Sequence, residues 1–192
     1  MRKLIFVASL AATALGTPAL AQERAPFTGV HVEGLAGWDR TQANGGHDDG
    51  VAYGVGAGFD FQAGRAVLGV EGEASDASTK QCVGATSVAG DRLCAKAGRD
   101  LYVGGRIGAL VGPATLVYAK AGYTNGRYNL TYTEPTGVGN FKLHDNLDGV
   151  RVGAGIEQAV GRNAYVKAEY RYSNYEQGFD RHQMVGGFGF RF

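Results

Sequence analysis

Residues Met184–Phe192 read MVGGFGFRF. Aromatic side chains fall at Phe188, Phe190 and Phe192, with Gly189 and Arg191 between them. This period of two predicts a β-strand with one aromatic face and one face that is small or charged. Glycine weakens an ordinary strand because it contributes no packing. It suits a strand whose second face borders a crowded interior, as in a small closed barrel.

Seven further segments upstream alternate in the same way. Between residues 51 and 61, for example, Val51, Tyr53 and Val55 alternate with Ala52 and Gly54. The apolar spacing of three and four residues that marks an amphipathic helix is not sustained after residue 21. The sequence therefore predicts an all-β fold with eight strands, at about residues 28–38, 51–61, 67–75, 101–111, 116–123, 150–160, 165–172 and 184–192.

The connections between these segments alternate in length. The long ones follow the first, third, fifth and seventh segments, at residues 39–50, 76–100, 125–149 and 173–180. The short ones follow the second, fourth and sixth, at residues 62–66, 112–115 and 161–164. Transmembrane barrels show this pattern because their periplasmic turns are short and their external loops long. We therefore predict an eight-stranded antiparallel up-and-down transmembrane β-barrel, with both ends in the periplasm and the long loops extracellular.

The chemistry of hydrocarbon decides which face of the barrel points outward. A bilayer offers no partner to polar side chains, so the apolar faces meet lipid. The alternative is a soluble barrel with an apolar core, but it would place Gly54, Gly56 and Gly58 on a solvated face that has no need of small residues. Aromatic residues near the strand ends predict two interface girdles. They are Trp38, Tyr53, Tyr123, Tyr170 and Tyr172 near the loops, and Phe59, Phe61, Phe190 and Phe192 near the turns.

The opposite faces place charged side chains in the lumen. Six acidic and six basic residues share it and can form a paired network, since unpaired buried charges are costly. Eight strands leave an interior just wide enough for side chains to fill. We therefore predict a plugged lumen or, at most, a narrow gated conduit. The network comprises Glu33, Asp60, Glu71, Glu73, Arg106, Lys120, Arg151, Glu157, Lys167, Glu169, Arg171 and Arg191.

The amino-terminal residues have the features of a secretory signal peptide. Arg2 and Lys3 precede a short apolar stretch, and Ala19-Leu20-Ala21 fits a small-x-small cleavage site. The alternative is a buried amino-terminal helix. Cleavage after Ala21 would leave a single domain at residues 22–192. Of the 19 basic and 18 acidic residues, 17 and 18 would remain, so no excess of positive charge indicates a nucleic-acid partner.

The chain has two cysteines, Cys82 and Cys94, both in the second long connection. An exported protein meets an oxidising environment, so we predict a disulfide that closes this loop. A metal site is the alternative, but no histidine lies nearby and two cysteines alone are a weak signal. The sequence predicts no cofactor. No serine after residue 21 shares a strand face with a histidine two residues away, as a barrel hydrolase would need, so we predict no enzyme.

Several tracts together resemble a known family. They are GRIGA at 105–109, YAKAGY at 118–123, VGAGIE at 152–157 and VKAEYRY at 166–172. With the terminal Phe192, they resemble the small outer-membrane β-barrels, which include opacity-type surface proteins, porin-like outer-membrane antigens of alphaproteobacteria and the barrel domain of OmpA-type proteins. The resemblance implies an outer-membrane location. It also implies an assembly signal, made of Phe188, Phe190 and Phe192, through which the barrel-assembly machinery recognises the last strand.

The resemblance implies no single activity, because members of the family serve as structural proteins, adhesins or minor pores. We predict a structural or surface-interaction protein, adhesin-like or antigen-like, that is held in outer-membrane lipid. Its long loops are the predicted site for an external ligand. The alternative function is a small-solute porin-like channel, and a soluble carrier barrel is a third possibility. The sequence leaves the identity of the ligand and the oligomeric state open.

Overall fold

A computed structural model of the chain describes residues 26–43, 46–78, 80–84, 92–133, 140–176 and 179–192. The predicted signal peptide and its cleavage site at Ala21 lie outside these residues and stay predictions. Within the described ranges there are nine strands, β1 (Gly29–Ala43), β2 (Gly46–Ala63), β3 (Ala66–Ala77), β4 (Lys80–Gly84), β5 (Arg92–Leu110), β6 (Thr115–Thr133), β7 (Phe141–Val160), β8 (Ala164–Tyr175) and β9 (Phe179–Arg191).

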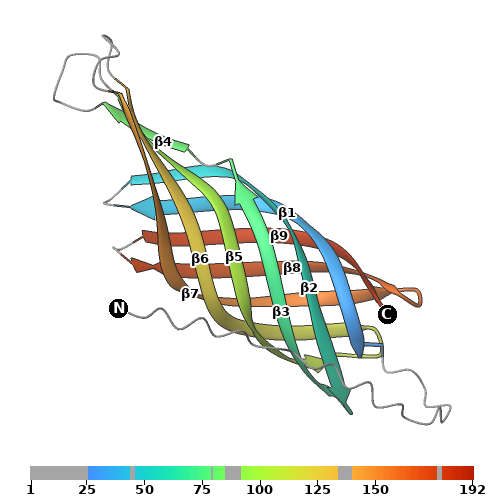
Figure 1. Ribbon diagram of the computed structural model, residues 1–192. Helices are drawn as coiled ribbons and strands as arrows, with labels where there is room; N and C mark the ends of the chain where they lie inside the picture. The colour runs from blue at the N-terminus through green and yellow to red at the C-terminus, as the bar shows by residue number, and fades with distance from the viewer. Residues whose placement is uncertain (1–25, 44–45, 79, 85–91, 134–139, 177–178) are drawn as a thin grey trace, which may run out of the picture.

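The strands form one antiparallel sheet that closes on itself (Figure 1). The order is β3-β2-β1-β9-β8-β7-β6-β5-β4, and β3 also pairs with β5. Eight strands therefore make the ring, while the short β4 adds to β5 outside it. Closure removes the exposed sheet edges that an open sheet of this length would present. The predicted eight-stranded antiparallel barrel is confirmed.

The strands extend further than predicted on the side of the long connections. Tyr132 of β6 is still paired with Phe141 of β7, so most of residues 125–149 is strand. The same is true of residues 39–50, and the prediction of long loops there is wrong. Each predicted strand ends where its outward face stops being apolar. On β7 that face turns polar at the positions preceding Val150, yet backbone pairing continues.

The short turns and the ends of the ring lie together at the other end of the barrel. Gly64 has φ 61°, a conformation that glycine adopts without strain in a tight turn. Leu110 N donates to the carbonyl oxygen of Arg65, and Arg191 N donates to that of Asn163. These hydrogen bonds join successive turns to the neighbouring strand ends. We call this end the turn end.

First and last strands meet at a closely packed seam. Phe192 N donates a hydrogen bond to the carbonyl oxygen of Val30, just past the end of β9. A Cβ atom on Gly29 would lie 2.0 Å from the carbonyl oxygen of Phe192. Gly29 also has φ 132°, which L side chains rarely adopt. Only glycine therefore lets the carboxy-terminal residue close the ring at this point.

The outward faces are apolar. Val55, Val70 and Val103 each expose more than 60% of their surface, whereas the charged side chains of the predicted lumen network are buried. Among the predicted girdle residues, Trp38, Tyr53, Tyr123 and Tyr170 are exposed beyond mid-barrel, and Phe59, Phe61, Phe190 and Phe192 are exposed near the turn end. This distribution is opposite to that of a soluble barrel with an apolar core. Separately, no helix in the described ranges is long and apolar enough to span a bilayer.

Candidate functional site

All twelve residues of the predicted lumen network are buried inside the barrel. They occupy alternate positions of their strands, opposite the apolar outward faces. The strand period of two therefore places every charge of the set on the same side of the closed sheet. Along the barrel axis the buried charges form three connected tiers, which we call the lower, middle and upper tiers, counting from the turn end.

The lower tier is built around Asp60 on β2. Arg106 Nε donates to Asp60 Oδ1 at 2.7 Å, and Arg191 Nη2 donates to Asp60 Oδ2 at 2.8 Å. Arg191 also reaches Glu157 at 2.7 Å, and Arg106 reaches it at 3.2 Å. His31 Nδ1 lies 3.2 Å from Asp60 Oδ2. Two arginines and two carboxylates thus form a closed ring of ion pairs across four strands.

Lys120 is the centre of the middle tier. Its Nζ lies 2.8 Å from Glu71, 2.7 Å from Glu73 and 2.8 Å from Glu169. Arg171 Nη2 donates to Glu73 at 3.0 Å, and Arg171 Nε also donates to Glu169. One lysine therefore holds carboxylates from two strands that lie on opposite sides of the ring, β3 and β8.

A second lysine extends the middle tier to the seam strands. Lys167 Nζ donates to Glu33 at 2.5 Å and lies 3.3 Å from Glu169. The Tyr165 hydroxyl donates to Glu33 at 2.8 Å, and the Tyr118 hydroxyl donates to Glu169. Buried tyrosine hydroxyls thus donate to these carboxylates in addition to the lysines.

The upper tier contains three charged residues that the sequence analysis missed. Arg181 donates to Asp39 at 2.6 Å and to Asp100 at 2.9 Å, and Arg151 also binds Asp100. Arg151 Nε donates to the Ser173 hydroxyl at 2.8 Å. The predicted loops include Asp39 and Asp100, and Arg181 lies outside the last predicted strand. Their strand parity, extended by a few residues, would have placed them in the lumen.

Counting these additions, the buried set in the described part of the chain holds eight carboxylates and seven Lys or Arg side chains, with His31 beside Asp60. The predicted balance of six to six is therefore incomplete. At the turn end the charges give way to an apolar cluster of Phe27, Val67, Leu110, Leu116 and Tyr118. Phe27 precedes β1 and is fully buried, and no sequence signal marked it.

Outside the apolar band, Asp180 is held at the rim of the barrel. The Tyr172 hydroxyl and Asn174 Nδ2 each donate to Asp180 Oδ1 at 2.7 Å. Both hydrogen bonds favour the carboxylate form. The bond from Tyr172 is the largest cause that holds the pKa of Asp180 below its usual value, and the bond from Asn174 adds to it.

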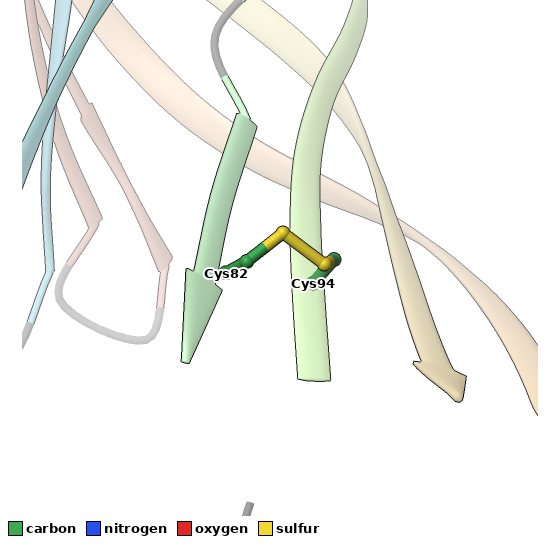
Figure 2. Close-up of a disulfide and its surroundings, with 2 residues drawn as sticks. All are labelled: Cys82 and Cys94. Carbon is green, nitrogen blue, oxygen red and sulfur yellow. A yellow bond between two sulfur atoms is a disulfide. The ribbon is translucent and has the colours of Figure 1, made fainter. Parts of the chain in front are cut away.

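A four-stranded extension rises beyond the ends of β1, β8 and β9 (Figure 1). We call it the projecting sheet and define it as β4 with residues 92–97 of β5, 127–133 of β6 and 141–147 of β7. Its outer strand is fixed by the predicted disulfide, which is confirmed between Cys82 and Cys94 (Figure 2). The two cysteines are direct cross-strand partners. The bond therefore joins β4 to β5.

Comparison with known proteins identifies the family. The profile described as "Outer membrane protein beta-barrel domain" matches residues 7–192. The chain belongs to this family. A search of curated proteins finds no match.

Solved structures of other outer-membrane barrels share the fold. Ail, the attachment invasion locus protein of Yersinia pestis, solved in complex with the heparin analogue sucrose octasulfate, is 15% identical, with a TM-score of 0.59 over 86% of this chain and 99% of Ail. Neisserial surface protein A is 14% identical, with a TM-score of 0.61 over 86% of this chain and 98% of that one. The outer membrane enzyme PagL is 15% identical, with a TM-score of 0.47 over 84% of this chain and 99% of PagL.

For an outer-membrane barrel, the exposed apolar band is the wall that faces lipid. The buried charge network then lies inside a closed ring of hydrogen-bonded strands, the kind of sheet that a bilayer requires. The projecting sheet continues the wall past the aromatic residues. The outward positions of β6 change from Tyr123 to Asn125 below the sheet and to Arg127 at its start. This change of polarity marks where the wall leaves the hydrocarbon.

Proposed function

We propose that this outer-membrane barrel is a surface-interaction protein with a sealed lumen, and that its projecting sheet makes the external contacts. The turns, the start of β1 and the end of β9 then lie in the periplasm, and the projecting sheet lies outside the cell. Support for this orientation comes from the short connections at the turn end and the long extensions at the other.

The single observation that carries the proposal is the filled interior. Among the residues whose burial is described, fifteen Lys, Arg, Asp and Glu side chains within the ring are at most 7% exposed. Below them, the Phe27 cluster occupies the turn end. An eight-stranded barrel has little further room for a water-filled path. The alternative of a small-solute channel requires these side chains to move together.

Planar-bilayer recording separates the sealed barrel from the channel. We expect purified, folded protein to give no stable discrete openings at either polarity, with a large trimeric porin as the positive control. Stable unitary openings from the unmodified protein would favour the channel and overturn the sealed lumen.

The surface role is supported by the fold that this chain shares with Ail, whose solved complex contains a heparin analogue. We expect bacteria that display the protein to adhere to a surface that carries the external ligand of the projecting sheet. A variant in which residues 127–147 are replaced by a tight turn should lose that binding. Its barrel, checked by resistance to urea in vesicles, should remain folded. Equal binding by both forms would assign the contact elsewhere and overturn this role for the projecting sheet.

The proposed activity needs neither catalysis nor a cofactor. Ser173 is buried and accepts a hydrogen bond from Arg151, and Ser78 hydrogen-bonds with the backbone of Val51.

We further propose that the outward side chains of Phe188, Phe190 and Phe192 form the assembly signal of the last strand. Replacing Phe192 with Ala should slow insertion in cells while leaving refolding of the purified chain unchanged. Equal delays in both assays would point to a folding defect.

A further inference from the structure

The lipid-facing wall of the barrel is hollowed over β9, β1, β2, β3 and β5. The hollow has a volume of about 930 Å³, within the range of roughly 300–1,000 Å³ that ligand pockets have. Phe188 and Phe190 border it on β9, with their rings in edge-to-face contact at 5.1 Å, and Leu101 borders it on β5. We call it the wall groove. Its floor consists of small outward-facing residues on three neighbouring strands, Gly34, Ala57, Gly72 and Ala74.

Two floor glycines leave a space that the protein itself does not fill. A Cβ atom on Gly34 would meet no heavy atom of the described chain within 4 Å. One on Gly72 would lie 3.7 Å from the carbonyl oxygen of Tyr102, an ordinary contact. Both glycines lie in regular strand, so neither needs a conformation reserved for glycine. The barrel would accept larger residues at both positions, and their absence is what makes the wall hollow.

The depth of the wall groove restricts what can reach it. Gly34 lies four residues from Trp38 in the girdle near the loops, about 14 Å along the strand. It lies equally far from Val30 at the turn end. Glu33 and Glu73 also border the groove, but their side chains are buried in the lumen. The groove therefore opens on hydrocarbon, and only an apolar chain or another membrane-embedded surface can enter it.

We propose that the wall groove binds one acyl chain of a membrane lipid and holds it more tightly than the rest of the wall holds its lipid. Strand register aligns the groove in a row across five strands, through Phe188, Gly34, Val55, Ala74 and Leu101. Such a row is about 19 Å long. The chains of one leaflet extend through half of a core about 30 Å thick, or about 15 Å. The groove is therefore long enough for one chain.

The tilt of the strands suits a chain that descends from the membrane surface. Strands of such barrels are tilted by about 35–45°, so a row across them runs obliquely through the membrane. An acyl chain that follows the row from Leu101 toward Phe190 moves around the barrel and along its axis together. It makes dispersion contacts with the floor and with both borders, which a convex wall does not offer.

A second copy of the barrel fits the wall groove less well than a lipid chain does. A two-fold interface places the same surface on both partners. It would set one hollow against another and leave a void, whose lining loses its dispersion contacts. A flexible hydrocarbon chain fills the hollow instead. The inference concerns the wall alone and goes beyond the contact role proposed for the projecting sheet.

The test measures lipid retained by the full, folded protein in neutral detergent, by native mass spectrometry. The probe is dipalmitoyl phosphatidylcholine, and the reference is glycerophosphocholine, the same headgroup without acyl chains. We expect the unmodified protein to retain one molecule of the lipid and none of the reference. Gly34→Leu with Gly72→Leu should lower the retained fraction about fivefold, because two leucine side chains take the place of the lipid chain on the floor.

The matched control fills two outward glycines that do not line the groove. Cβ atoms on Gly105 and Gly186 would lie 3.7 Å and 3.8 Å from their nearest neighbours, so leucine fits there equally well. Gly105→Leu with Gly186→Leu should leave the retained fraction within about twofold, because the groove keeps its contacts. Both double variants should keep the urea midpoint of the unmodified protein in vesicles. Should the first not insert, Gly34→Leu alone, at the more open position, replaces it with a loss in the same direction.

Three outcomes would overturn the proposal. Unchanged retention in the groove variant, or an equal loss in both double variants, would show that the wall groove is not the site. Retention of glycerophosphocholine as strong as that of the lipid would assign the binding to the headgroup. A dimer of the unmodified protein that retains no lipid and is lost in the groove variant would make a second copy the occupant.

Discussion

Glu169 is the residue whose loss should disturb the lumen most directly. It lies 2.8 Å from Lys120 and 3.3 Å from Lys167, and it accepts from Arg171. Glu169→Ala would leave these buried cations short of a partner, at a cost of about 3–5 kcal/mol. We expect a lower urea midpoint in vesicles and a raised conductance. The exposed Glu176→Ala, which removes the same charge at the rim, should change neither; an equal loss there would show that net charge, not the network, is responsible.

Ala168, one residue earlier, tests the other side of the same strand. It is exposed on the lipid-facing wall, and its neighbours across the strands are Ile156 and Gly186. Ala168→Arg should cost about 2–4 kcal/mol because it places a charge in hydrocarbon. Unfolding in vesicles should report this loss, with conductance unchanged and Ala168→Leu as the neutral control. Open channels from Ala168→Arg alone would mean that the two faces are reversed.

Asp180 gives a pH-dependent test outside the membrane. Its pKa is lowered in the folded protein, first by the hydrogen bond from Tyr172. This contribution to stability is therefore present above the carboxyl's unfolded pKa and is lost as pH falls through the lower folded pKa. Tyr172→Phe should raise the pKa of Asp180 toward its usual value, measured by carbon NMR of the labelled carboxyl group. Tyr170→Phe, which removes a hydroxyl bound to His182 instead, is the control; an equal shift there would contradict the assignment.

Among the elements, β4 depends most on a covalent bond. It is a five-residue strand that the Cys82–Cys94 disulfide ties to β5. Cys82→Ser with Cys94→Ser should release β4, since the constraint on this short ring is worth roughly 3 kcal/mol in the chain-entropy account. Hydrogen exchange should quicken in residues 80–84 and stay slow in the ring strands. A variant that no longer inserts into membranes would show that β4 supports the barrel itself.

The existence of each ring strand could be predicted from the sequence, but its outer end could not. Alternation of apolar and small residues is strong where one face meets lipid, as from Val51 to Phe61. On β6 and β7 the outward face becomes polar beyond Tyr123 and Val150, so the apolar criterion stops while hydrogen bonding continues. The apolar criterion therefore predicts loops where the projecting sheet lies. Its register depends on backbone pairing that a single-strand pattern does not specify.

At the scale of the whole molecule, the requirements of the bilayer allow the fold and most of the lumen residues to be predicted from the sequence. Because the wall has to be closed and apolar on its outside, its charged side chains can lie only in the lumen. All twelve predicted lumen charges are buried there. The apolar cluster at the turn end could not be predicted in the same way. Phe27 lies before the first strand, and its burial depends on contacts with Leu110 and Leu116 from distant strands. No local period connects these residues.

The seam between β1 and β9 has a consequence for synthesis. The ring closes only when the last residues hydrogen-bond to the first strand, at Val30 and Phe192. Until then, the partly made sheet has two open edges and no interior that can exclude water from its charges. Closure joins the most distant parts of the barrel, so it comes late and slowly relative to the local hairpins. Until β9 is available to pair with β1, the chain therefore has exposed strand edges, so it depends on being kept from aggregation until the ring closes.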